Sequence, residues 1–120
     1  MTKDIEGGLK MSGKFELYKD HAGEFRFRLK AGNGENILAS EGYSTKSNCK
    51  NGIESVRKNA VADANYQKKE TKAGKYMFNL KAANRQVIGT SQSYTTVASR
   101  DKGIESVKGN AMNAVVEDLT

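Results

Sequence analysis

The chain has no proline and no tryptophan among its 120 residues, and it carries one cysteine and one histidine. The cysteine, Cys49, has no partner for a disulfide within the chain. The histidine, His21, falls in a predicted turn, where we expect a surface side chain. The two do not form a nucleophile and base pair, and they are too few for a zinc site. We therefore expect no enzyme activity, no catalytic residue, no cofactor and no metal site.

Long apolar segments are also missing. No apolar run approaches the 18 residues of a membrane-spanning helix, so we expect no membrane partner. The first ten residues lack the apolar centre of a signal peptide, and a lone cysteine is typical of a reducing compartment, so we predict a cytoplasmic protein. The glycines at residues 31–35 (AGNGE) belong to a predicted hairpin turn and not to a phosphate-binding loop that opens a helix.

The charge is basic but moderate. Twenty Lys and Arg against 14 Asp and Glu give a net charge of +6 and a pI near 9.4. This balance permits a polyanionic partner. The same balance is also common in small domains that bind no nucleic acid, so the charge alone does not assign a function.

The most informative feature is a tandem repeat. Residues 23–60 align with residues 74–111 at a constant offset of 51 without a gap, and 17 of the 38 positions are identical. Each copy of about 50 residues is too small to bury a stable core alone, so the two copies should share one core. We expect one domain at residues 13–120, made of repeat one (13–63) and repeat two (64–120), after a flexible leader at residues 1–12.

Apolar periodicity predicts the same elements in both copies. Apolar and polar side chains alternate in the predicted strands, and apolar side chains recur at i, i+4, i+7 and i+11 in the predicted helices. The predicted strands lie at 15–20, 24–31, 36–40, 65–70, 75–82 and 114–119, and the helices at 46–60 and 97–111. Residues 65–70 both close repeat one and open repeat two. The pattern predicts an α+β domain whose single antiparallel sheet carries both helices on one face.

The two predicted hairpins differ at one position. Asn33-Gly34 suits a tight turn because glycine accepts a positive φ angle at little cost. The second copy has Asn84-Arg85 at this place. We expect the second turn to be less favourable or to have another conformation.

Several motifs carry a family resemblance: FRFRLKAGNGE and GIESV in repeat one, and FNLKAAN, QVIGTS and GIESVKGNA in repeat two. They closely resemble the YegP-like family of small bacterial proteins, over about residues 13–120. The resemblance implies a single sheet of tandem β(3)-α-β units that swap their C-terminal strands. It implies no known activity, so it supplies no catalytic residue.

One candidate binding surface is the sheet face opposite the helices. Side-chain parity places an aromatic residue and several basic or polar residues there, namely Tyr18, Arg26, Arg28, Lys30, Met77, Asn79 and Lys81. Such a face is a candidate platform for single-stranded nucleic acid. Glu16 and Glu24 share the face, and one aromatic residue is fewer than an RNA-recognition motif presents.

A second candidate lies in the loops before the helices. Tyr43 and Tyr94 recur there, where they either stack on a ligand or cover the edge of the core; we favour the second role. Gly52 and Gly103 recur within the helices, where glycine costs about 1 kcal/mol relative to alanine. Close packing is our preferred reason for them, and a kink or a ligand contact is the alternative.

From the sequence we predict a non-enzymatic interaction or accessory module. The internal repeat supplies the symmetry that a dimer of single repeats would have, so we expect a monomer. An exposed edge of the sheet is the expected site for a protein partner. The alternative function is nucleic-acid or polyanion binding through the basic sheet face.

Overall fold

The computed structural model describes residues 13–120, and the predicted leader at residues 1–12 lies outside the described residues. The elements are β2 (Lys14–Lys19), β3 (Phe25–Lys30), β4 (Asn36–Ala39), α2 (Lys46–Asn59), a short 3-10 turn (Asp63–Asn65), β5 (Tyr66–Glu70), β6 (Tyr76–Lys81), β7 (Val87–Thr90), α3 (Val97–Ala111) and β8 (Val115–Asp118). Both helices agree with their predicted bounds within one residue.

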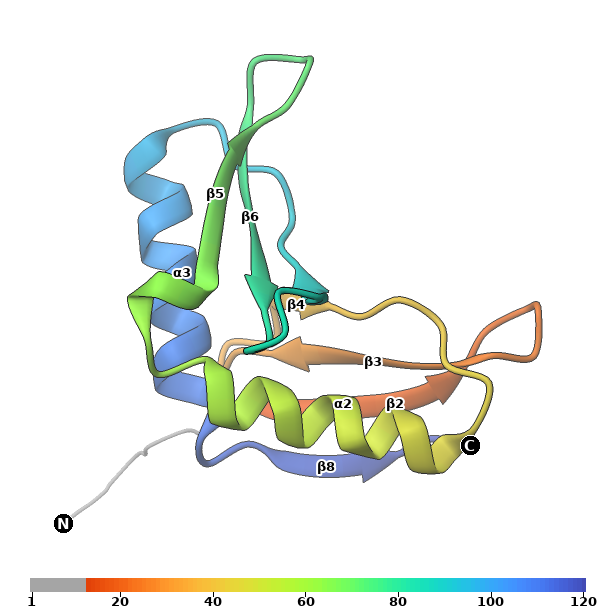
Figure 1. Cartoon of the computed structure of the whole chain (residues 1–120). Helices are drawn as coiled ribbons and strands as arrows, with labels where there is room; N and C mark the ends of the chain where they lie inside the picture. The colour runs from red at the N-terminus through yellow and green to blue at the C-terminus, as the bar shows by residue number, and fades with distance from the viewer. Residues whose placement is uncertain (1–12) are drawn as a thin grey trace, which may run out of the picture.

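The seven strands form one sheet in the order β5-β6-β7-β4-β3-β2-β8. Helices α2 and α3 both cover its apolar face, so the predicted α+β architecture is confirmed (Figure 1). The two halves of the sheet meet at β4 and β7, where only Ala39 and Thr90 are paired. So short a junction lets the sheet bend, and the strands of the two repeats run across one another (Figure 1).

The last strand makes the sheet mixed and not wholly antiparallel, which corrects the prediction. β8 comes from repeat two but pairs in parallel with β2 of repeat one, with Lys14 opposite Val115. The alignment of the repeats explains this direction. β5 follows α2 and pairs with β6. By the repeat, β8, which follows α3, would pair in the same way with β3, but β2 already occupies that position beside β3. β8 therefore lies outside β2 and runs in the same direction. The pairing of β8 from repeat two with β2 of repeat one agrees with the strand swap that the family resemblance implied.

One core serves both repeats. Phe15, Phe27 and Phe78 of the sheet are fully buried, as are Val56 of α2 and Val107 of α3. Cys49 belongs to this core as a free thiol, and burial raises its pKa to about 11. This agrees with its predicted role in packing.

The two hairpins use the same turn despite their different sequences. Gly34 has a φ of 89°, and Arg85 at the equivalent position has a φ of 74°. Arg85 is therefore held in the left-handed region that glycine prefers. Of the two expectations for this turn, the less favourable conformation is the one found.

Candidate binding site

The outer face of the sheet in repeat one carries the predicted basic residues. β2 and β3 are antiparallel neighbours, with Glu16 opposite Arg28 and Tyr18 opposite Arg26. The period of two along each strand places these four side chains on the face away from the helices. The structure therefore brings Tyr18, Arg26, Arg28 and Lys30 together, as predicted.

Glu16 neutralises much of this face. Its side chain is 8% exposed, and its Oε1 atom lies 2.7 Å from Arg28 Nε and 3.5 Å from Lys30 Nζ. Its Oε2 atom lies 3.4 Å from Lys14 Nζ. The hydrogen bond from Arg28 lowers the pKa of the Glu16 carboxyl below its ordinary value. We call Glu16 and its three cations the Glu16 cluster.

The two arginines of this face are also used internally. Arg26 Nε donates to Asp20 Oδ2 at 2.6 Å, and this bond lowers the pKa of Asp20. The Arg28 guanidinium lies 4.4 Å from the centroid of the Tyr18 ring and covers one face of it. A polyanion would have to displace carboxylates to reach these cations, so the face offers less free positive charge than the sequence suggested.

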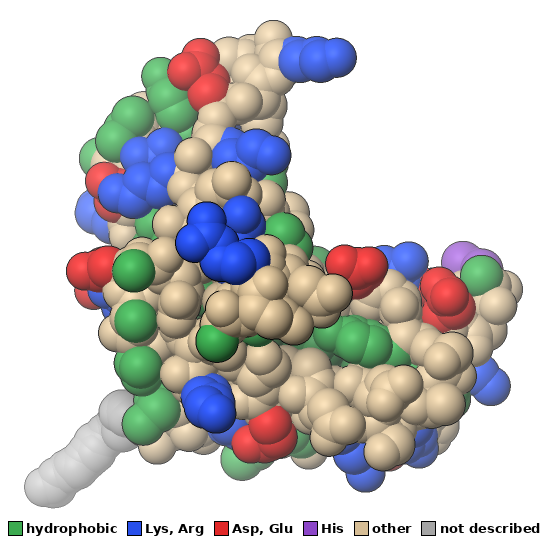
Figure 2. Space-filling model, in the orientation of Figure 1, with side chains coloured by type: hydrophobic (Ala, Val, Ile, Leu, Met, Phe, Trp, Pro, Cys, Tyr) green, Lys and Arg blue, Asp and Glu red, His purple; other side chains and the backbone are tan. Residues whose placement is uncertain are grey.

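The candidate residues of repeat two lie apart from that group. Asn79 and Lys81 are on β6, which β7 and β4 separate from β3. Asn79 is largely buried and accepts a hydrogen bond from Thr90 Oγ1 at 2.9 Å. The predicted residues therefore do not form one continuous basic platform. On the opposite side of repeat one, where α2 lies in front of β2, Lys and Arg side chains form small groups among Asp and Glu (Figure 2).

Tyr43 and Tyr94 explain the repeated glycines. The Tyr43 ring stacks on Phe27 with centroids 6.3 Å apart, and a Cβ on Gly52 would lie 2.9 Å from Tyr43 Cζ. In repeat two, a Cβ on Gly103 would lie 2.7 Å from Tyr94 Cζ. Both glycines therefore let a tyrosine ring lie against the helix, which supports the packing interpretation. Burial raises the pKa of Tyr43, whose ring covers the edge of the core.

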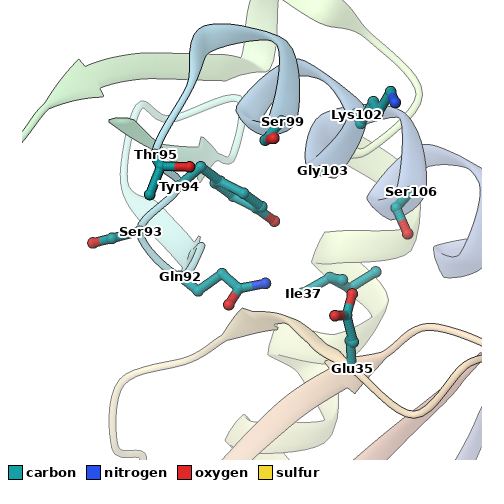
Figure 3. A pocket seen from close by; sticks show the side chains of 10 residues that line it. All are labelled: Glu35, Ile37, Gln92, Ser93, Tyr94, Thr95, Ser99, Lys102, Gly103 and Ser106. Atoms are coloured by element: carbon teal, nitrogen blue, oxygen red, sulfur yellow. The ribbon is translucent and has the colours of Figure 1, made fainter. Parts of the chain in front are cut away.

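Beside Tyr94 is a groove that the sequence did not predict. It has a volume of about 470 Å³ and is built from both repeats. Most of the residues that line it are polar: Glu35 and Ile37 of repeat one, Gln92, Ser93, Tyr94 and Thr95 of the loop after β7, and Ser99, Lys102, Gly103 and Ser106 of α3 (Figure 3). We call it the inter-repeat groove. Its recurrence in the loop before the helix makes Tyr94 a candidate from the sequence, but no local sequence pattern predicts that Glu35 and Lys102 line the same groove.

The exposed edge at β8 is apolar in its first half and acidic in its second. All four of its residues are exposed, with Val115 at 65% and Val116 at 41%, and Leu119 directly after it is 48% exposed. A groove of about 390 Å³ runs between β8 and α2, lined by Lys50, Asn51, Ile53, Glu54, Val116 and Asp118. We call this the β8 groove.

The opposite edge of the sheet is different. β5 presents Gln67, Lys68, Lys69 and Glu70, all exposed. Charged side chains, lysine above all, discourage another strand from pairing with an edge. Of the two edges in the described part of the chain, β8 has two exposed valines and no lysine and is therefore the better suited to a partner strand.

Residues 13–120 contain neither a metal-binding group nor a membrane-spanning helix. No group of three or more His, Cys, Asp or Glu side chains is placed to hold a metal ion in this range. None of the helices described there is long and apolar enough to cross a membrane.

Comparison with known proteins gives a consistent result. The model of the family described as "Domain of unknown function (DUF1508)" matches residues 20–67 and again residues 71–118, one match in each repeat. The chain is 66% identical to the UPF0339 protein in the ptx operon 5′ region of Stutzerimonas stutzeri, with 91% of this chain and 98% of that protein covered. It is 53% identical to the UPF0339 protein YegP of Escherichia coli, with 92% and 100% covered.

The fold has solved counterparts too. The solution NMR structure of YegP from Escherichia coli, a protein of unknown function, is 52% identical and matches with a TM-score of 0.88 over 94% of this chain and 97% of that one. That of a UPF0339 protein from Shewanella oneidensis is 54% identical, with a TM-score of 0.86 over 92% and 93%. Two family matches at the repeat spacing, over one continuous seven-stranded sheet, identify the chain as a member of the DUF1508 (UPF0339, YegP-like) family.

Proposed function

We propose that the protein is a non-enzymatic interaction module that binds an extended segment of another protein along β8. The observation that carries this proposal is that the exposed edge of β8 lies directly beside the β8 groove. An added strand gains main-chain hydrogen bonds from an edge, and its alternate side chains need a pocket beside that edge. β8 supplies the edge, and Val116 and Ile53 supply an apolar floor.

The charges around the β8 groove define the partner. Glu54 and Asp118 line the groove, and Glu117 lies on the strand itself. Lys14 and Lys46 pair with Glu117 and Asp118. Glu54 pairs with Arg57 along α2 at 3.2 Å, but its side chain is 68% exposed, so it is also accessible to a basic group of a partner. The fitting partner is an extended segment with apolar residues at alternate positions and a basic residue at its end.

A partner protein suits this edge better than a second copy of the chain. β8 has four residues, and two such strands paired about a twofold axis would bury far less than the ~1,200 Å² of a stable interface. We infer that the protein is a monomer. Its lone, buried Cys49 suits a reducing compartment, and we infer that the protein works in the cytoplasm.

An NMR titration tests the proposal. The probe is a short peptide of alternating valine and threonine with lysine at both ends, and the control peptide has proline at its centre, which breaks a strand ladder. We expect the probe to shift the amides of Val115–Leu119 and Lys50–Glu54, and the proline peptide to shift neither. Val116→Lys should abolish the shifts, whereas Val97→Lys, at a valine 45% exposed on α3, should leave them intact. Equal responses to both peptides, or none, would refute the proposal.

Polyanion binding by the outer sheet face is the second candidate, supported by the gathering of Arg26, Arg28 and Lys30. It requires those cations to exchange Asp20 and Glu16 for phosphates. A titration with single-stranded oligonucleotides at low and physiological salt tests it. A salt-dependent affinity that falls when Lys30 is replaced by Gln would support this function. The control variant is Lys72→Gln, in the exposed β5–β6 turn. If Lys30→Gln and Lys72→Gln bound the oligonucleotide with equal affinity, polyanion binding by the outer sheet face would be excluded.

A further inference from the structure

We propose that a pocket of repeat two binds a phosphate monoester, held by Lys81 and Arg85. The pocket has a volume of about 390 Å³ and lies where β5 begins, beside the end of β6 and the turn that follows it. Gln67, Lys81 and Arg85 are among the residues that line it, and none of the lining residues is Asp or Glu. We call it the β6-turn pocket. The proposal does not depend on the function proposed for the β8 groove.

Lys81 distinguishes this pocket from the rest of the charged surface. Nine Lys and Arg residues between residues 13 and 120 are half-buried, namely Lys14, Arg26, Arg28, Lys30, Lys46, Arg57, Lys81, Arg100 and Lys108. Eight of them have a carboxylate oxygen within 3.5 Å of a side-chain nitrogen. Lys81 is the exception within this range. A cation that is partly removed from water needs a counter-charge, and for Lys81 a bound anion would supply it.

The equivalent place in repeat one shows how Lys81 lost its counter-charge. The offset of 51 places Gln67 where Glu16 stands and Lys81 where Lys30 stands. In repeat one, the Glu16 carboxylate lies 3.5 Å from Lys30 Nζ. In repeat two this carboxylate is replaced by the amide of Gln67, while the lysine is retained. The pair that is neutral in one copy is therefore positively charged in the other.

Arg85 adds a second cation to the pocket at a conformational cost. Its φ of 74° lies in the left-handed region, which the equivalent Gly34 adopts without steric penalty. Hydrogen bonds from Arg85 N to Ala82 O and from Ala82 N to Gln86 O, both of 2.9 Å, close the turn directly after Lys81. A non-glycine residue held in a strained conformation points to a role for its side chain. Within residues 13–120 Arg85 forms no ion pair that would account for this strain.

The chemistry of the β6-turn pocket fits a phosphate monoester better than other anions. Its two cations match the charge of about −1.5 to −2 that a monoester carries at neutral pH. A guanidinium binds two phosphate oxygens through parallel N–H groups, and an ammonium binds as a compact charge. Gln67 Oε1 accepts a hydrogen bond from Asn79, so Gln67 Nε2 can donate to a further oxygen. A carboxylate or a phosphodiester brings a single charge, and we expect both to bind more weakly.

The test is a backbone-amide NMR titration with phenyl phosphate, a monoester, at constant ionic strength. Dimethyl phosphate models the diester of a nucleic-acid backbone, and acetate presents a carboxylate. We expect saturable shifts at Gln67, Lys81 and Arg85 with phenyl phosphate, and an affinity lower by about tenfold or more for the two controls. Absence of saturable shifts with phenyl phosphate, or equal affinity for either control, would overturn the proposal.

Matched variants test the residues. Lys81→Gln and Arg85→Gln should each weaken the binding of phenyl phosphate about tenfold, because each removes a charge-assisted hydrogen bond. Gln67→Glu restores the carboxylate of repeat one and should abolish binding. Lys69→Gln is the control, because Lys69 is exposed on the same strand as Gln67 but does not line the pocket.

The fold should survive these changes, since Gln67, Lys69 and Arg85 are exposed and Lys81 is the last residue of β6. Unchanged affinity in Gln67→Glu, or equal losses in Lys69→Gln and Lys81→Gln, would show that the β6-turn pocket does not hold the phosphate.

Discussion

Gly89 of β7 lies directly against the side chain of Leu38 of β4, so that a Cβ on residue 89 would lie 2.5 Å from Leu38 Cδ2 and 2.6 Å from Leu38 Cγ. The two residues occupy equivalent positions in the repeats. They meet where the two halves of the sheet join, and that junction has room for one large side chain. A leucine in one copy therefore requires a glycine in the other.

Gly89→Ala should destabilise the protein by about 1–3 kcal/mol through overpacking against buried Leu38. Urea unfolding followed by circular dichroism measures the change. Leu38→Ala should cost about 2–5 kcal/mol in the wild-type background, and clearly less when Gly89 is already alanine. Additive losses in the double variant would contradict the contact.

Gly103→Ala and Gly109→Ala should act in opposite directions although both lie in α3. Helix propensity alone predicts a gain of about 1 kcal/mol for each. A Cβ on Gly109 meets nothing within 4 Å, so that gain should appear. A Cβ on Gly103 would press on Tyr94, so that variant should lose stability. Thermal unfolding of the two variants measures this, and the loss at Gly103 should shrink in a Tyr94→Ala background.

Arg85→Gly should stabilise the second hairpin by about 1 kcal/mol, because glycine accepts a φ of 74° without steric cost. Gly34→Ala at the equivalent turn should destabilise by a similar amount. Chemical denaturation measures both. If Arg85→Gly left the stability unchanged or lowered, the arginine side chain would have to make a compensating contact.

Glu16→Gln should change the pH dependence of stability. Arg28 lowers the pKa of Glu16 in the folded state, so the unfolded state binds protons first as the pH falls. The contribution of Glu16 is therefore complete above the unfolded pKa near 4.5 and is lost as the pH falls through the lower, folded pKa. At pH 7 the variant should be about 2 kcal/mol less stable.

The measurement is the midpoint of urea unfolding for the two proteins between pH 7 and pH 2.5. Their difference should narrow below pH 4.5. Protonation of other carboxylates, such as Asp20 and Asp118, also lowers the stability of both proteins in this range. Subtracting the free energy of unfolding of the variant from that of the wild type removes their effect. A difference that stays constant with pH would show that the Glu16 cluster contributes no charge interaction.

Local pattern predicts much of this fold for a physical reason. The alternation in residues 24–31 and the helical spacing from Cys49 to Ala60 depend only on neighbours along the chain. The partner and direction of β8 depend on which place in the sheet β2 has already taken, and no period in residues 114–119 records that. Local pattern therefore predicts that β8 is a strand but not that it pairs in parallel.

In the candidate sites too, local pattern predicts which face a side chain lies on but not which distant residues it contacts. Strand parity correctly places Arg26 and Arg28 on the outer face, but parity does not reveal that Asp20 and Glu16 hold them. Tyr94 stands out because it recurs. Glu35 and Lys102 do not recur as charges, and only the packing of one repeat on the other brings them to the same groove. A sequence comparison between the copies, searching for positions where charge differs, is the signal that could have found them.

The parallel pairing of β2 with β8 has a consequence for synthesis on the ribosome. β2 is among the first elements of the described chain to be made, and its outer edge stays without a partner until β8 has been translated. Closing this pair joins the two ends of the described sequence, the kind of long-range contact that slows folding. During translation the nascent chain therefore exposes a strand edge that the finished protein covers, and a chaperone that shields extended segments would have its natural binding site there.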